Sequence, residues 1–498
     1  MLPKEFSKLV LWLPLFFLFI FCVDIYFTVP NADDYDFFIW VDKYGFFDFQ
    51  KFMYLNQNGR FVSAFFIACY SVLFNGIHSY WIFPLFFFIL YFSSIVFFIK
   101  VFFECLRINI ISLTKYSYAA YVTLLFILVC KEMSSFLFWM PGIINYQLPV
   151  TFLIFGISCI IKCLFAKNKI SLITGLTCIA LASGCHEMIF LLITPGLLVF
   201  IILYLKNKNL RNILILIFFS ILIPFLISIL SPGTTNRQVE LNTNDTSIIN
   251  LVAGSLIRVV FLFSNLLAVP YLYIVLALVY IFFIKINNPE IKAALKNLNI
   301  KVVIIVAALQ PLFIFLLTMK KFGSGLPERV DNLLLIQLTI FLLLIAIKSG
   351  VDTFSLNSIF YRSALGRIFI SLLIFLCICS PNFINGIKGI FAGYYYKQIS
   401  EARIKNAENK NGITSLHLTH YENELDSFYK KKYNKRMPDK LFSIANKKQI
   451  ILFRDVDDLL GGQNNSFRHY HNIDTLKTPF SISYGDTLIY LSVKKHAL

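Results

Sequence analysis

The stretch LVLWLPLFFLFIFCVDIYFTV, residues 9–29, decides the fold of this chain because it is apolar over the length that a bilayer demands. A helix needs about 20 predominantly apolar residues to cross the hydrocarbon core. Lys4 and Lys8 precede the stretch, and no small-residue cleavage site of a signal peptide follows it. We therefore expect a retained membrane span whose N-terminus lies in the cytoplasm.

Similar apolar runs recur along most of the 498-residue chain, which is 58% hydrophobic and only 14% charged. Soluble domains carry about 25% charged residues, so this composition excludes a soluble protein. We expect an all-α polytopic membrane protein with about 11–13 transmembrane helices. The predicted spans are roughly 9–29, 61–77, 80–103, 118–131, 145–165, 170–185, 187–205, 212–231, 268–286, 302–319, 330–347 and 364–381. The stretch 247–267 contains Arg258 and is either an interfacial helix or a further span.

Membrane topology explains the formal net charge of +18 better than nucleic-acid binding does, because most Lys and Arg residues flank the apolar runs. Four basic clusters mark the predicted cytoplasmic side: Lys162/Lys167/Lys169, Lys206/Lys208/Arg211, Lys285/Lys292/Lys296/Lys301 and Arg362/Arg367. The loops 30–60, 131–145, near 186, 232–246 and 320–329 then fall on the other side, together with the tail. This topology needs an odd number of crossings, and twelve are clear. One span is therefore missed or misjudged, within 100–145 or 247–286.

The composition changes near Asn382, where the chain becomes richer in charge. The tail carries 18 of the 45 Lys and Arg residues and 11 of the 27 acidic residues. Alternating stretches such as ITSLHLTHY (413–421), QIILFRDV (449–456) and FSISYGDTLIYLSV (480–493) are typical of strands. We predict a membrane domain, 1–381, followed by a small soluble α/β or β-rich extracytoplasmic domain, 382–498.

The first loop opens with PNADDYDFF, residues 30–38, directly after the first span. Its five acidic residues are interleaved with aromatic rings: Asp33, Asp34, Asp36, Asp42 and Asp48 alternate with Tyr35, Phe37, Phe38, Trp40, Tyr44, Phe46, Phe47 and Phe49. A disordered solvated loop does not carry so many aromatic residues. The pattern predicts a helix lying on the membrane surface, with its rings in the headgroup layer. Either this helix is a plain connector, or its carboxylates carry chemistry.

Cationic residues on the presumed outer side break the positive-inside trend and predict an anionic ligand there. They are Arg60 in NQNGRF (56–61), Arg237 in SPGTTNR (231–237), and Lys320, Lys321 and Arg329 in KKFGSGLPERVDN (320–332). A guanidinium at such a position suits bidentate contact with a phosphate. Arg60 has an alternative explanation, because an arginine at the mouth of a span can also snorkel to lipid headgroups.

Three further groups of polar residues complete the predicted site. Asn58 lies where the chain re-enters the membrane, and FWMPGIINYQLP (138–149) carries Trp139, Asn145 and Tyr146, a rigid aromatic edge suited to stacking on a sugar ring. GCHE (184–187) places His186 and Glu187 between two spans. An acidic residue at membrane depth is costly and marks a functional hypothesis. Taken singly, each of these loops could be an ordinary connector.

Several chemistries are disfavoured because their motifs are missing from the sequence. It contains no Walker loop, no GxGxxG after a strand, and no HExxH or CxxC metal spacing. The ten cysteines lie within or at the ends of apolar segments, and we interpret them as small apolar residues of helices. The histidine pairs of the tail, His417 with His420 and His469 with His471, are interpreted as surface residues.

The chain resembles the bacterial GT-C-type integral membrane glycosyltransferases, especially the serotype-converting group, over roughly residues 9–385. The resemblance lies in ADDYDF after the first span, NQNGRF, FWMPGIINYQLP, GCHE, SPGTTNR and LPER. It implies a multi-pass protein of the bacterial inner membrane that moves a hexose, such as glucose, with inversion. The donor would be an undecaprenyl-phosphate-linked sugar, and the acceptor a polysaccharide such as lipopolysaccharide O-antigen, at the periplasmic face.

The resemblance also implies that a first-loop aspartate is the general base, sometimes with a divalent metal such as Mg or Mn. That role would fall to Asp33 or Asp34, which diverge by about 100° on a helix, so that only one can point into the site. Glu187 is the third catalytic candidate. We also expect Arg60, Arg237 and Arg329 to converge with one of the aspartates.

Two other classes of function stay open. An O-antigen polymerase or ligase is also polytopic and rich in Phe, but its large catalytic loop is Arg-rich and lies late in the chain, whereas the acidic loop here comes first. A transporter or flippase of lipid-linked sugar favours internal repeats and charges in the middle of spans, and the sequence shows neither. A membrane scaffold without catalytic activity is the remaining alternative.

Overall fold

The computed structural model describes residues 4–30, 32–74, 79–107, 111–241, 248–285, 295, 298–322, 328–352, 372, 375–376, 378–408, 416–419, 480–484 and 487–491. The predicted span 364–381 and the predicted strand 449–456 lie wholly or largely outside these residues.

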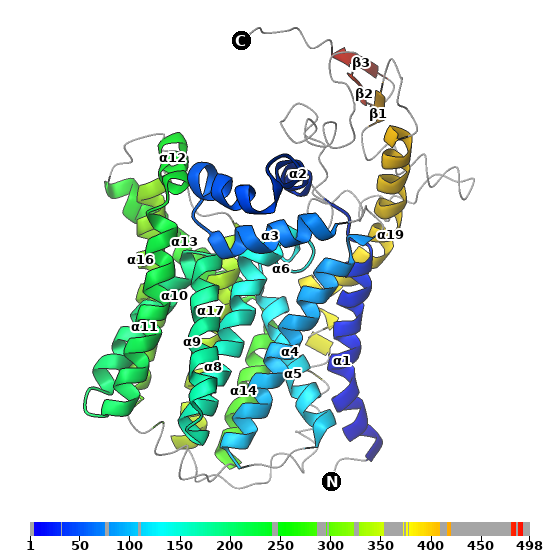
Figure 1. Ribbon diagram of the computed structural model, residues 1–498. Coiled ribbons are helices and arrows are strands. Elements are labelled where there is room, and N and C mark those ends of the chain that lie inside the picture. Colours follow the sequence, from blue (N-terminus) through cyan, green and yellow to red (C-terminus); the bar gives the residue numbers. More distant parts are fainter. Residues whose placement is uncertain are drawn as a thin grey trace.

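The described chain is a bundle of helices, most of which run side by side along one direction (Figure 1). In order they are α1 (Lys4–Tyr26), α2 (Ala32–Phe52), the π-helical η1 (Met53–Gln57), α3 (Phe61–Leu73), α4 (Ile82–Cys105), α5 (Ser112–Val129), α6 (Ser134–Leu137), α7 (Met140–Gly142), the π-helical η3 (Ile143–Gln147), α8 (Leu148–Ala166), α9 (Lys169–Cys185), α10 (Met188–Leu203), α11 (Lys208–Ile229), α12 (Pro232–Leu241), α13 (Ile248–Leu267), α14 (Pro270–Lys285), α16 (Ile300–Phe322), α17 (Glu328–Asp352) and α19 (Pro381–Glu408). Within the described residues, seven helices are long and apolar enough to cross a membrane, so the prediction of a polytopic all-α membrane protein is confirmed.

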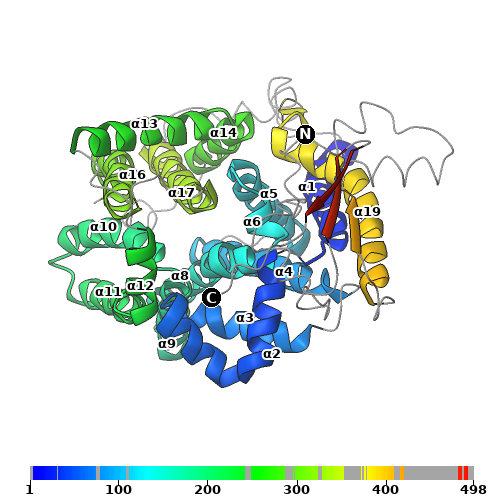
Figure 2. The same cartoon turned by 90° about the horizontal axis from the view of Figure 1, so that it is seen from above.

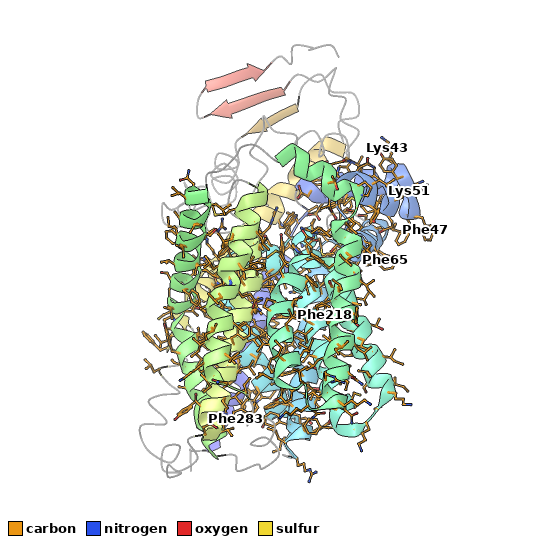
Figure 3. The ribbon with its side chains drawn as sticks, turned by 90° about the vertical axis from the view of Figure 1, so that its left-hand side faces the viewer. Lys43, Phe47, Lys51, Phe65, Phe218 and Phe283 are labelled. Atoms are coloured by element: carbon orange, nitrogen blue, oxygen red, sulfur yellow. The ribbon has the colours of Figure 1, made fainter. Side chains whose placement is uncertain are left out.

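The two ends of the bundle differ. α2, α3, α6 and α12 lie at one end, which we name the α2 end, and the N-terminus lies at the other (Figure 1). Figure 3 places Lys43, Phe47 and Lys51 at the α2 end and Phe283 at the opposite end. Seen from above, α13, α14, α16 and α17 form one group and α8 to α12 another, and α5 and α6 lie between the first group and α1 (Figure 2).

The predicted span at 61–77 is wrong. α3 has only 13 residues, which at 1.5 Å per residue is about 20 Å, against about 30 Å of hydrocarbon. It lies across the α2 end instead of along the bundle (Figure 1). Its buried face, which includes Val62, Ala64 and Ala68, packs with α2 in a common apolar cluster. The misjudged span thus lies at 61–77 and not within 100–145 or 247–286, where we expected it.

α13 and α14 together pass from the α2 end to the opposite end. Arg258 of α13 contacts Asp331 near the start of α17, whereas Phe283 of α14 packs against Phe102 near the end of α4. The break between the two helices precedes Pro270. A proline has no backbone N–H and disfavours helical geometry in the residue before it, so it suits a helix start. The stretch 247–267, left open by its composition, is therefore the first part of this passage.

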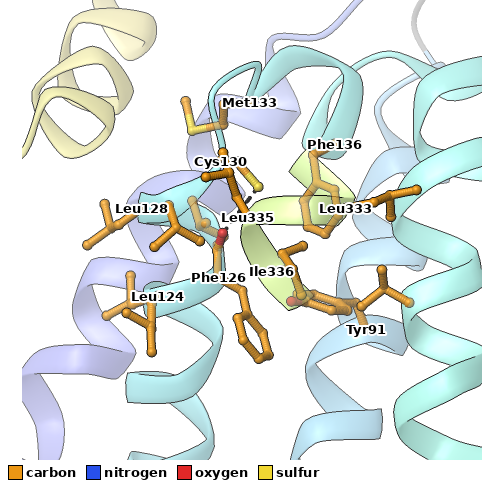
Figure 4. Packing of buried hydrophobic residues seen from close by; sticks show 14 of the residues in the cluster. Tyr91, Leu124, Phe126, Leu128, Cys130, Met133, Phe136, Leu333, Leu335 and Ile336 are labelled. Atoms are coloured by element: carbon orange, nitrogen blue, oxygen red, sulfur yellow. Dashed lines mark hydrogen bonds between the residues drawn. The ribbon is translucent and has the colours of Figure 1, made fainter. Parts of the chain in front are cut away.

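The core of the bundle surrounds α5. Residues 124–130 at its C-terminal end are all at most 4% exposed, and they pack with α1, α4 and α17. Figure 4 shows Leu124, Phe126 and Leu128 in one cluster with Tyr91 of α4 and with Leu333, Leu335 and Ile336 of α17. The second half of α5 is apolar on every side, and here neighbouring helices cover it instead of lipid.

Polar side chains satisfy backbone groups inside the bundle. Pro195 of α10 lacks the N–H that would pair with the carbonyl of Leu191. Gln310 Nε2 of α16 donates to that oxygen at 3.0 Å and also to the Leu192 oxygen, which accepts from Gln337 of α17 as well. Since hydrocarbon offers no hydrogen bonds, these contacts fix α10 against α16 and α17.

α19 runs beside α1 and carries the chain beyond the α2 end. Phe383 packs on Phe17 with ring centroids 4.6 Å apart, and Lys397 Nζ donates to the Tyr26 carbonyl at 3.0 Å. Asn382 Nδ2 donates to three carbonyl oxygens at the end of α5, including that of Cys130 at 2.7 Å. The predicted boundary at 381/382 thus falls at the start of α19, and the chain leaves the bundle at the end where α2 lies (Figure 1).

The described parts of the tail form three short strands: β1 (Leu416–Thr419), β2 (Phe480–Tyr484) and β3 (Thr487–Leu491). β1 pairs with β2 in parallel, and β2 pairs with β3 in antiparallel register, with Ile482 opposite Ile489.

Candidate functional site

The segment before Arg60 packs closely against the turn between α11 and α12. Gly59 has no room for a side chain, because a Cβ would lie 2.1 Å from the Ser228 carbonyl oxygen. Its N–H donates to Thr234 Oγ1 at 3.2 Å. Gly233 in turn approaches the backbone of Gln57, where a Cβ would lie 2.7 Å from the amide nitrogen. The close contacts of Gly59 and Gly233 therefore fix the position of Arg60 at the start of α3.

Arg60 binds Glu187 through two parallel hydrogen bonds. Its Nε and Nη2 donate to Oε2 and Oε1, each at 2.7 Å, across 127 residues of sequence. A third, longer contact joins Nη1 to Asn145 Oδ1 at 3.5 Å. Asn145 is itself held by its Nδ2, which donates to the Pro141 carbonyl at 2.6 Å. The side chains of Arg60 and Glu187 are 19% and 34% exposed, so the ion pair is only partly accessible to solvent.

The ion pair determines the protonation of Glu187. Burial alone would raise the pKa of this carboxyl, but the Arg60 guanidinium outweighs burial and holds the pKa well below its usual range. His186 Nδ1 accepts a hydrogen bond from the Met188 N–H at 3.1 Å and lies 3.6 Å from Glu187 Oε2. Because a base works best with a pKa near the ambient pH, Glu187 is better suited to orient Arg60 than to take a proton.

A second arginine lies nearby on an aromatic ring. The Arg329 guanidinium carbon is 5.3 Å from the centre of the Trp139 ring. Arg329 Nε is buried and has no hydrogen-bond partner within the described part of the chain. Tyr146 is within electrostatic reach of both Arg329 and Arg60, and its ring centre is 5.3 Å from that of His186. Tyr146 thus lies near both arginines.

The start of α17 is fixed by polar contacts to the loop after α5. Asn332 Oδ1 accepts from the N–H groups of Lys131 and Glu132 at 2.8 and 3.0 Å, and its Nδ2 donates to the Glu132 carbonyl at 2.7 Å. Asp331 contacts Lys131 Nζ at 3.7 Å and Arg258 Nη2 at 3.4 Å. These contacts set the position of Arg329 two residues earlier.

The two first-loop aspartates have different surroundings. Asp34 is completely buried, and its two oxygens accept from the hydroxyls of Tyr70 and Tyr80 at 3.2 and 3.0 Å. Asp33 is half-buried. The two side chains diverge as expected for neighbours in the first turn of a helix. Tyr80 Oη also accepts from the Met140 N–H at 3.2 Å, which links Asp34 to the turn that carries Trp139.

α2 lies across the end of the bundle, as the aromatic and acidic pattern predicts for an interfacial helix (Figure 1). Its outer positions Lys43, Phe47 and Lys51 are exposed, and Figure 3 shows them at the edge of the α2 end. Gly45 interrupts the helix with φ 73° and ψ 171°, a conformation that favours glycine.

The structure gathers most of the predicted site residues at the α2 end. The assembled set comprises Asn58, Arg60, Trp139, Asn145, Tyr146, His186, Glu187 and Arg329, with Asp34 joined to it through Tyr80. Asn58 contributes indirectly, because its Oδ1 accepts the Arg60 N–H at 3.1 Å. The side chains of Arg237, Lys320 and Lys321 lie outside the described residues, although α12 and α16 carry their backbones.

Sequence reasoning missed Tyr70, Tyr80 and Asn332. The tyrosines give no local signal, since their partner Asp34 is 36 and 46 residues away. Asn332 is the last residue of KKFGSGLPERVDN, directly before an apolar run. A polar residue at the mouth of a predicted span was the signal that could have identified it.

The residues around Asp34 do not fit a divalent metal. Both carboxylate oxygens already accept phenolic hydrogens, which a cation would displace. Across the described ranges, no three His, Cys, Asp or Glu side chains form a group that could hold a metal ion. Mg²⁺ and Mn²⁺ prefer several oxygen ligands, so the donor set here is too small.

Comparisons with protein-family models, curated proteins and solved structures give no match to this chain. The fold therefore defines a class, a multi-pass helical membrane protein with a polar site at one end. Its function has to be argued from that site.

Proposed function

We propose that this chain is an inverting membrane glycosyltransferase that moves a hexose, such as glucose, from undecaprenyl phosphate to a surface polysaccharide. The observation that carries the proposal is Arg329. Its guanidinium stacks on Trp139 at the α2 end and has no carboxylate partner in the described ranges. Arg329 is half-buried, with its Nε shielded from solvent. Since it is costly to remove part of a cation from water without an anion, this position suits a phosphate at the membrane boundary.

The chemistry follows from the charges. The acceptor hydroxyl attacks the anomeric carbon, the bond from that carbon to the phosphate oxygen breaks, and the configuration inverts. Negative charge grows on the departing polyprenyl phosphate, where the Arg329 guanidinium stabilises it. Arg60 uses Nε and one Nη2 hydrogen on Glu187, which leaves N–H groups on its outer edge for the same phosphate.

The acceptor proton needs a base. The partial exposure of Asp33 supports it over Asp34, whose carboxylate is buried and occupied by two hydroxyls. Glu187 is disfavoured because Arg60 depresses its pKa. The sugar would contact Trp139, Tyr146 and Asn145. Its apolar C–H faces can pack on the two aromatic rings, and its hydroxyl groups can form hydrogen bonds with the amide.

The proposal includes a location. A GT-C-like enzyme of the bacterial inner membrane would hold the α2 end and the tail, 382–498, on the periplasmic side. The N-terminal Lys4 and Lys8 at the opposite end support this orientation through the positive-inside trend. An α/β or β-rich tail at the α2 end would then lie beside the polysaccharide acceptor.

The test measures hexose transfer from radiolabelled undecaprenyl-phosphate-glucose, or from other undecaprenyl-phosphate hexoses, in membranes that contain the full chain and the lipopolysaccharide of its host. We expect Arg329→Gln to lower the rate about 10²-fold, as for loss of one preorganised donor. The control is Arg211→Gln at the start of α11, where the arginine is half-buried at the opposite end. Equal rates for the two variants at equal membrane levels would overturn the proposal, as would absence of transfer by the unaltered chain from every donor.

A further inference from the structure

We infer that Asp34 is a positioning residue that fixes the turn at 139–141, and through it both arginines of the site, by means of the Tyr80 hydroxyl. This inference deepens the proposed function and rests on it for the ligand of the arginines. The contacts themselves are independent of any ligand.

The first step is the burial of the carboxylate. Asp34 has 0% exposure and lies between Tyr70 and Tyr80, whose rings meet edge-on at 6.0 Å. Each oxygen accepts one phenolic hydrogen. A buried carboxylate is tolerated only when such donors replace its water, so the two tyrosines and Asp34 hold one another in a single arrangement.

The second step runs from Tyr80 to the turn. The hydroxyl that donates to Asp34 also accepts the Met140 N–H, and both Tyr80 and Met140 are completely buried. Since a hydroxyl has only one hydrogen, its donation to Asp34 leaves the oxygen lone pairs to face Met140. The carboxylate therefore sets the direction in which Tyr80 binds the turn.

The third step leads from the turn at 139–141 to each of the two arginines. On one side Trp139 carries the Arg329 guanidinium at 5.3 Å. On the other side the Pro141 carbonyl accepts from Asn145, whose Oδ1 contacts Arg60. Gly142 has no freedom to shift, because a Cβ there would lie 2.4 Å from the Ser135 carbonyl oxygen. A displacement at Met140 would thus reach both arginines.

This role differs from that of a general base. A base has to touch the acceptor hydroxyl, whereas Asp34 contacts tyrosine hydroxyls and is shielded from solvent. A positioning residue should change the geometry of Trp139 in the absence of substrate, and loss of a base should not. That contrast makes the two roles separable without an activity assay.

The experiment uses the full chain in nanodiscs, with Trp12, Trp40 and Trp81 replaced by Phe so that Trp139 is the sole reporter. We expect Tyr80→Phe and Asp34→Asn each to shift the Trp139 emission and to raise its quenching by acrylamide about twofold without ligand. The matched control is Tyr91→Phe, since Tyr91 is also completely buried but its hydroxyl has no partner in the described chain. Trp139 emission and quenching that stay at the values of the control in Asp34→Asn, or in Tyr80→Phe, would overturn the inference.

A second measurement separates this inference from the proposed function. Undecaprenyl phosphate is added to the nanodiscs and its binding is followed by Trp139 emission. We expect Tyr80→Phe to weaken binding about tenfold, and the double variant with Asp34→Asn to be no weaker than the worse single variant, because both act through one chain of contacts. Shifted ligand-free emission without any binding by the unaltered chain would support the positioning role and contradict the proposed donor.

Discussion

Two arginines at the α2 end differ in a way that separates support from recognition. Arg60 gives two hydrogen bonds of 2.7 Å to Glu187, so its charge is neutralised inside the protein. Arg329 lies on the face of Trp139, and its buried Nε has no partner in the portion of the chain that the structure describes. Both residues act electrostatically on Tyr146.

The difference teaches how one residue type serves two purposes. A paired arginine is worth most to the fold, since removal of either partner strands the other charge. An arginine on an aromatic ring keeps its hydrogen-bonding edge for a ligand while the ring stabilises its charge. The same substitution should therefore cost more stability at Arg60 than at Arg329, and more ligand binding at Arg329 than at Arg60.

The largest expected effect tests this contrast directly. Arg329→Gln should weaken the binding of undecaprenyl phosphate about 30-fold, because a charge-assisted hydrogen bond to a ligand is worth about 2 kcal/mol. It should leave the melting temperature nearly unchanged, since no contact to a carboxylate is lost. Binding is measured in nanodiscs and melting by differential scanning fluorimetry in detergent. A melting temperature that falls as far as in Arg60→Gln would erase the distinction between the two arginines.

A medium effect is expected from the ion pair. Glu187→Gln should lower the free energy of unfolding by about 2 kcal/mol, between the values for surface and buried pairs, because the pair is partly exposed. The measurement is urea denaturation of Glu187→Gln, Arg60→Gln and the double variant. The double variant should be more stable than the sum of the two losses implies, because neither charge is then left alone. Additive losses would show that the pair contributes nothing of its own.

The smallest effect is the pH dependence of the same pair. The pKa of Glu187 is lower in the folded chain than in the unfolded one, where it is about 4.3. Its contribution to stability is therefore complete above pH of about 4.3 and is lost as the pH falls toward the folded pKa. Melting temperatures from pH 7 to pH 3 should thus fall more steeply for the unaltered chain than for Glu187→Gln. Parallel curves would mean that Arg60 does not lower the pKa of Glu187 in the folded chain.

The sequence by itself determined the class of fold and the side on which the polar loops gather. Apolar runs such as 9–29 are local signals, and hydrocarbon accepts little besides helices, so composition and length were enough. The positive-inside trend then grouped the loops that carry Arg60, Glu187 and Arg329, and the structure does bring these three residues to one end.

Only the tertiary structure decided which partners these residues take. α3 is as apolar as a span, yet it lies across the bundle end, because its 13 residues are too few to cross and α2 covers its buried face. Arg60 and Glu187 are 127 residues apart, and Asp34 reaches Tyr80 across 46. Hydrophobicity acts on each segment separately, whereas the pairing of two buried polar groups depends on the distance between their atoms, and that distance is set only when the helices have packed.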